Sequence, residues 1–235
     1  MRDRVVVYMG NRHIYDMLCT AAKSLLCHTD VDRIYFLIDD PVFPYPLPPI
    51  IRTVNVHSQP YFPPTCPNIH PHYSYMTLMR SVLSKVLPDE HCVLLLDPDT
   101  IVCDDISPIW DTDISNYFFA AVRETRNHNH KKNPYYNAGV MLMNLDKFRN
   151  EYIDDTIIQS LNVRRYEHLE QDALNFVCDR NILDLPSDYN TSFVSDEPTV
   201  PRIRHYLSFA KKFWPAAAEP YRTMSWEQAL KGAEK

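Results

Sequence analysis

The chain has 235 residues, of which 45% are hydrophobic, and its 24 Lys and Arg against 30 Asp and Glu give a formal charge of -6. This composition is that of an ordinary globular protein, and the negative charge argues against a nucleic-acid partner. The apolar runs are too short for a membrane span, and the first residues lack the apolar stretch of a secretory signal. Six cysteines without a CxxC pair indicate reduced thiols. We therefore expect a single cytoplasmic domain over residues 1–235.

Strand and helix patterns alternate through the first half of the chain. Apolar, strand-like runs occupy 5–8, 33–38, 52–56 and 92–96, and helical spacing covers 14–25 and 73–87. In the second half we expect strands at 117–122 and 139–145, helices at 152–161 and 169–178, and short elements at 182–185 and 203–207. The last ten residues indicate a surface helix or a frayed tail. This β-α-β order predicts an α/β fold with a mostly parallel sheet and helices on both faces.

Glycine is scarce, with 3 residues against 19 prolines. Neither a GxGxxG turn nor a Walker loop is present, so the two commonest glycine-rich phosphate-binding loops are excluded. A phosphate group would have to be bound by a metal ion or by basic side chains.

The strand at 92–96 runs directly into Asp97-Pro98-Asp99. Because side chains alternate along a strand, residues at i and i+2 project to the same side, here at the strand end where open α/β sheets bind ligands. Two adjacent carboxylates repel each other, and a divalent cation such as Mg²⁺ or Mn²⁺ would relieve that repulsion. The alternative is a strand that leaves the core into a turn, with Asp99 as a capping residue. Both interpretations are open on this motif alone.

Three further segments combine polar residues with apolar elements. Asn137 precedes Gly139 at the start of a strand, Glu170-Gln171-Asp172 opens a helix, and His205 lies in a short strand six residues before Lys211. Each has a plain structural interpretation: a β-turn, a helix N-terminus with favourable dipole charges, and a hydrogen-bonded structural histidine. Taken singly, none of them establishes a site.

Together, the four motifs match one family in order and spacing. The sequence resembles glycosyltransferase family 8, the retaining transferases that include glycogenin and the bacterial lipooligosaccharide galactosyltransferases. The family's DxD segment, NAGV strand, DQD helix and terminal HFxGxxKPW-like stretch all have counterparts in this sequence, between residues 21 and 214. The resemblance implies a GT-A fold, a single Rossmann-like domain whose central, mostly parallel mixed sheet is flanked by helices. It also implies transfer of a hexose from a UDP-sugar with the help of Mn²⁺.

The resemblance assigns the metal and diphosphate ligands. Asp97, Asp99 and His205 would hold Mn²⁺, with Mg²⁺ as the other candidate. Lys211 matches a lysine at the donor diphosphate, and Arg80 matches an arginine that braces the donor site. The plain alternative for Arg80 is an exposed ion pair on a helix surface, worth about 1 kcal/mol or less.

The same resemblance assigns the sugar-binding residues. Asn137 and Glu124 would contact the donor sugar, and Gln171 would lie beneath the reacting carbon, flanked by Glu170 and Asp172. Because the amide of Gln171 is a poor nucleophile, we favour front-face attack, in which the acceptor oxygen enters on the side that the diphosphate leaves.

Several positions depart from the family pattern. The nucleoside-binding motif is replaced by the segment from Tyr8 to Tyr15, within which Asn11 and Tyr15 are the candidates for contacts with base and ribose. The first aspartate of DQD is Glu170, one methylene longer. The glycine that approaches the phosphate is Ser208. None of these changes removes an expected metal ligand.

We therefore expect a transferase that uses UDP-glucose or UDP-galactose and acts on a glycan, a protein or another hydroxyl acceptor. One alternative is self-glucosylation in the manner of glycogenin, with a tyrosine of the chain as the first acceptor. Another is a catalytically silent module that binds a sugar nucleotide. The sequence does not indicate the oligomeric state.

Overall fold

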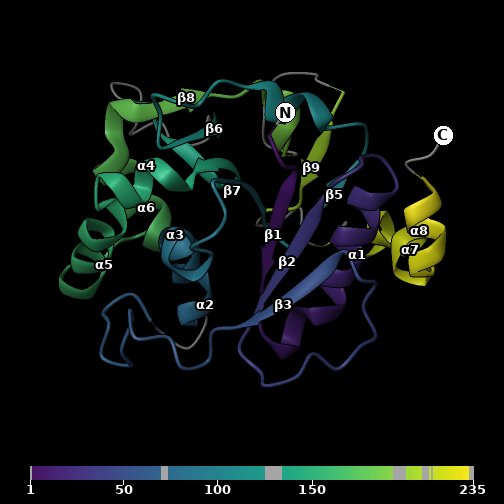
Figure 1. The fold of residues 1–235 in the computed structure, drawn as a ribbon, viewed down its shortest axis with the longest axis horizontal. Coiled ribbons are helices and arrows are strands. Elements are labelled where there is room, and N and C mark those ends of the chain that lie inside the picture. The colour runs from purple at the N-terminus through teal and green to yellow at the C-terminus, as the bar shows by residue number, and fades with distance from the viewer. Residues whose placement is uncertain are drawn as a thin grey trace.

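A seven-stranded mixed sheet forms the centre of the computed structural model, which describes residues 2–69, 74–124, 134–192, 200–207, 212 and 214–232 (Figure 1). The strand order is β3-β2-β1-β4-β7-β6-β8. The bounds are β1 Val5–Met9, β2 Arg33–Ile38, β3 Ile51–Asn55, β4 Cys92–Leu96, β6 Phe119–Arg123, β7 Tyr136–Asn144 and β8 Ile182–Asp184. The central mixed sheet with flanking helices confirms the predicted fold class.

The first four strands of this sheet run parallel, as their β-α-β order predicts. Their apolar side chains alternate between two faces, so that Val5 and Val7 enter one core while Val6 and Tyr8 enter the other. Both faces of β1 and β4 are buried, which explains why these two strands read as continuous apolar runs, whereas the edge strand β3 is mostly exposed.

β7 is the strand that makes the sheet mixed. It runs antiparallel to both β4 and β6, whereas β6 and β8 are parallel. Leu96 at the end of β4 pairs with Val140 at the middle of β7, so the first half of β7 extends past the end of β4. As a consequence, the first residues of β7 lie beside the carboxyl end of β4, where the acidic motif begins.

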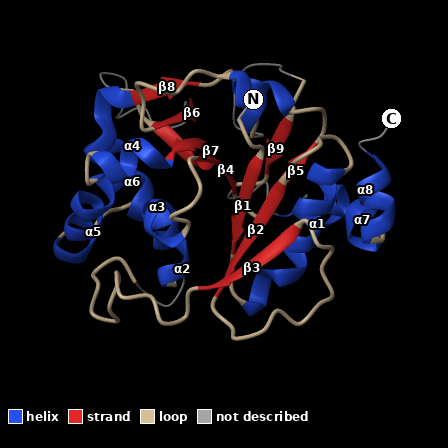
Figure 2. Cartoon of the chain, viewed as in Figure 1, coloured by secondary structure: helices blue, strands red, loops and turns tan. Residues whose placement is uncertain are grey.

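Helices cover the two faces of the sheet in two groups (Figure 2). On one side lie α2 Tyr75–Leu78, α3 Leu83–Val86, α4 Leu145–Asn150, α5 Ile153–Val163 and α6 Leu169–Cys178. On the other lie α1 Tyr15–Leu26, α7 Trp214–Thr223 and α8 Trp226–Gly232, with α7 and α8 both against α1. Among the described residues, none of these helices combines the length and the apolar character that crossing a bilayer requires.

The helix predicted at 73–87 is interrupted. A 3₁₀ turn over Met79–Val82 separates α2 from α3. All four of its residues are buried, which a straight amphipathic helix with one apolar face cannot achieve. The turn directs Arg80 into the interior rather than onto the helix surface.

A two-stranded antiparallel ribbon lies outside the main sheet. β5 Thr100–Val102 pairs with β9 Ile203–His205, and the register places Thr100 opposite His205. Tyr206 and Trp214 then join a small apolar cluster with Ile101. The ribbon attaches the C-terminal part of the chain to the acidic motif. All six cysteines are free, in agreement with the expected reduced thiols.

Candidate active site

Asp97 and Asp99 lie in a tight turn between β4 and β5. The strand ends at Leu96, and Thr100 closes the turn through its main-chain N–H and its hydroxyl, which donate to the carbonyl oxygen of Asp97 at 3.1 and 2.7 Å. The two carboxylates converge, as predicted. The predicted cause was wrong, because a turn, and not the alternation of side chains along a strand, brings the two carboxylates together.

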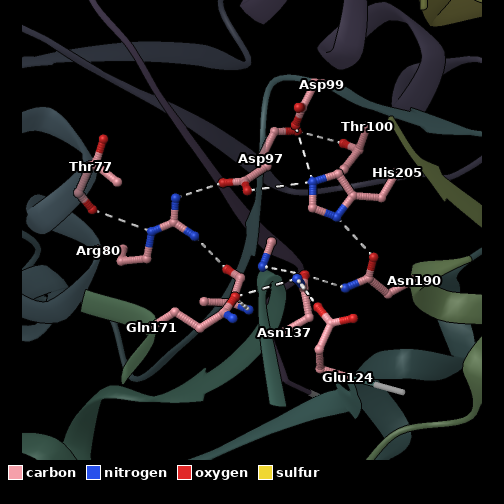
Figure 3. Close-up of polar contacts among 12 residues, drawn as sticks. Thr77, Arg80, Asp97, Asp99, Thr100, Glu124, Asn137, Gln171, Asn190 and His205 are labelled. Atoms are coloured by element: carbon pink, nitrogen blue, oxygen red, sulfur yellow. Dashed lines mark hydrogen bonds and ion pairs between the residues drawn. The ribbon is translucent and has the colours of Figure 1, made fainter. Parts of the chain in front are cut away.

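His205 completes a cluster of three potential metal ligands. The β5–β9 pairing brings its imidazole to the turn, where Nε2 lies 3.1 Å from Asp99 Oδ1 and 3.5 Å from Asp97 Oδ2 (Figure 3). The ligand atoms of all three residues lie within 4.8 Å of one another. The imidazole is 1% exposed, while the two carboxylates keep 18% and 13% of their side-chain surface. The imidazole of His205 is therefore buried, while the two carboxylates reach the surface.

Gly139 makes room for this cluster. A Cβ atom at this position would lie 2.0 Å from Cε1 of His205 and 2.9 Å from Oδ2 of Asp97. The carbonyl oxygen of Gly139 accepts a hydrogen bond from the main-chain N–H of Asp97 at 2.8 Å. The close approach thus requires glycine. Two carboxylate oxygens and one imidazole nitrogen that share such a cradle fit a divalent cation of the Mn²⁺ or Mg²⁺ kind.

Arg80 is buried, and its Nε donates to the carbonyl oxygen of Thr77 at 3.3 Å (Figure 3). Nη2 donates to Asp97 Oδ1 at 2.8 Å, Nη1 donates to the carbonyl oxygen of Ala138 at 2.6 Å, and Nε lies 3.0 Å from Glu170 Oε1. One guanidinium therefore links the acidic turn, β7 and α6. The exposed ion pair considered as the plain alternative is wrong.

Glu170 shares the guanidinium of Arg80 with Asp97. Its side chain is 4% exposed, and among the described residues Oε2 has no hydrogen-bond partner. Burial raises the pKa of the Glu170 carboxyl to about 7, and the nearby Arg80 offsets only part of this effect. A carboxyl group in this state holds its proton near neutral pH more readily than an ordinary glutamate.

Amide side chains line the β7 side of the cluster. Asn137 Nδ2 lies 3.2 Å from Glu124 Oε2 and 3.3 Å from Gln171 Oε1, which also accepts from the main-chain N–H of Ala138 at 2.9 Å. Asn137 therefore contacts both of the other residues that the resemblance places at the donor sugar, Glu124 and Gln171.

Asp172 has both carboxylate oxygens occupied. Oδ1 accepts from the hydroxyl of Tyr135 at 2.5 Å, and Oδ2 accepts from the main-chain N–H of His168 at 2.8 Å. The Tyr135 hydroxyl in turn accepts from Gln171 Nε2 at 3.1 Å. These bonds make Asp172 part of the N-terminal turn of α6.

A hollow of about 500 Å³ lies at the carboxyl ends of β1, β2 and β3. Asn11, Asp39 and Asp40 are among its lining residues. Tyr15 is buried behind it, and its hydroxyl donates to Asp40 Oδ2 at 2.9 Å. Tyr8 is not part of this hollow, because its side chain is fully buried and its hydroxyl donates to the carbonyl oxygen of Ala21 at 3.3 Å.

Two predicted residues, Ser208 and Lys211, lie outside the described part of the chain. Conversely, Asn190 and Tyr135 contact the amide network and were not predicted. Tyr135 precedes the NAGV strand that was singled out, but nothing in a single sequence separates its hydroxyl from those of other tyrosines. Asn190 ends a 3₁₀ turn that no motif marks.

Comparison with known proteins decides the family. The profile of Glycosyl transferase family 8 matches residues 50–217, which is most of the chain. The chain belongs to glycosyltransferase family 8. This family membership confirms the resemblance.

Curated members of the family match over most of the chain. A Haemophilus influenzae glycosyltransferase is 24% identical over 207 residues, 79% of this chain and 62% of the relative. Glycosyltransferase GlyE of Streptococcus pneumoniae is 27% identical over 261 residues, 97% of this chain and 61% of GlyE. The chain thus spans about three fifths of the length of these relatives.

Solved structures of family members share the fold. The crystal structure of GlyE superposes with a TM-score of 0.76 at 23% identity, covering 98% of this chain and 63% of that chain. The galactosyltransferase LgtC, in complex with donor and acceptor sugar analogs, gives 0.74 at 22% identity, covering 95% and 98%. The fold of this family 8 chain is therefore of the GT-A type.

Proposed function

We propose that this chain is a retaining, metal-dependent glycosyltransferase that moves glucose or galactose from a UDP-sugar to an acceptor hydroxyl. The observation that carries the proposal is the Asp97, Asp99 and His205 cluster at the carboxyl end of β4 in a family 8 chain. The relatives GlyE and LgtC are named as a glycosyltransferase and a galactosyltransferase.

The order of features along the sheet edge supports a nucleotide-sugar donor. The hollow with Asn11 lies at β1 to β3, the acidic turn follows β4, and the amides of Asn137 and Gln171 lie at β7 and α6. Because β1, β4 and β7 are neighbours, a nucleoside, a diphosphate and a sugar would meet these features in that sequence. Tyr15 would act on the nucleoside only through Asp40.

Asp97, Asp99 and His205 would hold Mn²⁺ or Mg²⁺ in this arrangement. Such an ion, when bound, supplies Lewis-acid stabilisation of the charge that develops on the departing diphosphate. Arg80 fixes the Asp97 carboxylate by its 2.8 Å bond, so that the carboxylate is oriented before the donor arrives. Lys211 would add a second positive charge at the diphosphate, by its match to the family motif.

The sugar side of the site supports front-face attack. Both oxygens of Asp172 accept hydrogen bonds, and Gln171 Oε1 accepts from Ala138 N–H and from Asn137, so neither group offers a free nucleophile. Glu170 Oε1 is engaged with Arg80, and burial raises the pKa of the carboxyl to about 7, so Glu170 holds its proton more readily than an ordinary nucleophilic carboxylate. The acceptor proton would then pass to an oxygen of the departing diphosphate. A glycosyl adduct trapped on Glu170 or Asp172 would contradict this mechanism.

The test is UDP release from UDP-glucose and UDP-galactose, each with Mn²⁺ and with a chelator, using the wild type and the double variant Asp97→Ala/Asp99→Ala. A matched control is Asp89→Ala, which removes an exposed carboxylate elsewhere. We expect metal-dependent release that the double variant loses and the control keeps. Equal release by wild type and double variant would contradict the proposal.

Two readouts of the same incubation define the reaction further. The anomeric configuration of the product, read by NMR, tests retention. The intact mass of the protein tests self-glucosylation, because hexose additions to the chain would identify one of its own side chains as the acceptor.

A further inference from the structure

Asn190 lies directly behind the metal-ligand histidine. It ends the 3₁₀ turn Ser187–Asn190 and is 8% exposed. Main-chain bonds hold it in place, since Thr191 N–H donates to Ile203 O and His205 N–H donates to Thr191 O, both at 3.0 Å. Its side chain contacts Nδ1 of His205 at 3.0 Å on one side and Asn137 Oδ1 at 2.8 Å on the other (Figure 3).

A main-chain N–H group fixes the orientation of the first amide in this chain. The N–H of Gly139 donates to Asn137 Oδ1 at 3.0 Å, and an N–H group can only donate. The atom of Asn137 at this position is therefore the oxygen. Its Nδ2 points the other way, toward Glu124 Oε2 and Gln171 Oε1, where a donor is required.

The orientation of Asn190 follows from that of Asn137. The atom that faces the Asn137 oxygen must be a donor, so it is Nδ2, and the remaining atom of Asn190 is its oxygen. This oxygen faces Nδ1 of His205 and can only accept, so Nδ1 bears the hydrogen. In the neutral imidazole, Nε2 then carries the free lone pair, and Nε2 is the atom that faces Asp97 and Asp99.

We infer that Asn190 is a positioning residue that holds His205 in the Nδ1–H tautomer, so that Nε2 is presented as a metal ligand. The inference rests on the metal site of the proposed function and adds a residue to it. Asn190 also joins the metal ligands to the amides at the donor sugar, because one side chain contacts both His205 and Asn137. Partners of this kind, when removed, typically weaken metal binding 10- to 100-fold.

The test is Mn²⁺ binding by the purified full chain, measured by electron paramagnetic resonance of the free ion. Asn190→Leu keeps the approximate volume but offers His205 no acceptor, and it should weaken Mn²⁺ binding 10- to 100-fold. Asn190→Asp keeps an acceptor for Nδ1–H but loses the donor to Asn137 Oδ1, so it should bind Mn²⁺ more tightly than Asn190→Leu and less tightly than the wild type.

The control variant is Asn68→Leu. Asn68 is also buried and makes three hydrogen bonds, to the main chain of Leu161, Arg164 and Tyr166, away from the ligand cluster. It should lower the melting temperature and leave Mn²⁺ affinity unchanged. An equal loss of Mn²⁺ affinity in Asn68→Leu, or wild-type affinity in Asn190→Leu, would overturn the inference.

A second measurement reports on the wild-type imidazole directly, with one variant used only to assign its signal. In ¹⁵N-histidine spectra of the Mg²⁺-saturated protein, the His205 signal, assigned by its loss in His205→Gln, should show a protonated Nδ1 and a bare Nε2. A protonated Nε2 would overturn the inference. Absence of any Mn²⁺ or Mg²⁺ binding by the wild type would instead overturn the proposed metal site, and the role of Asn190 with it.

Discussion

Glu170→Gln should remove a pH dependence from the stability of this protein. Glu170 lies beside Arg80 but is buried, and its Oε2 has no hydrogen-bond partner within the part of the chain that the structure describes. Burial raises the pKa of this carboxyl from the ordinary 4.5 to about 7 in the folded chain. Glutamine has nearly the same shape and no charge, so the comparison isolates the ionisation.

The direction of this pH dependence follows from whether the folded or the unfolded chain holds the proton. Below pH 4.5 the carboxyl is protonated in both the folded and the unfolded chain, and ionisation costs no stability. Between about pH 4.5 and 7 the unfolded chain releases the proton while the folded chain keeps it, so stability falls as the pH rises. The pKa is 4.5 in the unfolded chain and about 7 in the folded chain, and each pKa unit is worth about 1.4 kcal/mol. The free energy of unfolding therefore falls by about 3 kcal/mol and stays constant above pH 7.

The assay is urea unfolding of metal-free wild type and Glu170→Gln at four pH values from 4.5 to 7.5. The free energy of unfolding of the variant, relative to wild type, should rise by about 3 kcal/mol over this range. Glu167→Gln, at an exposed carboxylate three residues earlier, should follow the wild type. A constant difference between Glu170→Gln and wild type would show that burial does not perturb this group and refute the reasoning.

Three further substitutions test other contacts of the site. Gly139→Ala places a Cβ 2.0 Å from Cε1 of His205, so the variant should lose Mn²⁺ affinity in a titration and melt at a lower temperature in calorimetry. An unchanged affinity and melting temperature would contradict the close approach. Arg80→Lys cannot hold two carboxylates and a carbonyl at once and should cost about 3 kcal/mol in urea unfolding, whereas an exposed arginine would cost much less. Tyr135→Phe leaves the Gln171 amide and the adjacent carboxylate without their shared hydroxyl, which should cost about 1–3 kcal/mol by the same assay.

The sequence was most informative where local chemistry sets the structure. Apolar runs identified β1, β2 and β4, and their order along the chain led to the parallel half of the sheet. The antiparallel direction of β7 was not foreseen, because a buried strand has the same composition in either direction. The break of the helix at Met79–Val82 was also missed, since it depends on what covers all sides of that turn.

The candidate site shows the same division. Two carboxylates after an apolar strand left both interpretations open, and Asp97, Asp99 and His205 became recognisable only because four motifs in order resemble those of the family. Asn190 was out of reach, because its importance comes from contacts with Asn137 and His205 across the fold. Which atom donates and which accepts in these hydrogen bonds is determined only once the folded chain brings the residues together.

The β5–β9 ribbon makes the site late to assemble. His205 and Asp99 are 106 positions apart, so a nascent chain that has emerged through β8 carries both aspartates but lacks the imidazole. Contacts between such distant segments form slowly compared with local ones. A cation that prefers the complete cluster would stabilise only the finished chain. In a refolding or translation experiment, the moment at which metal affinity appears would therefore time the docking of the C-terminal segment.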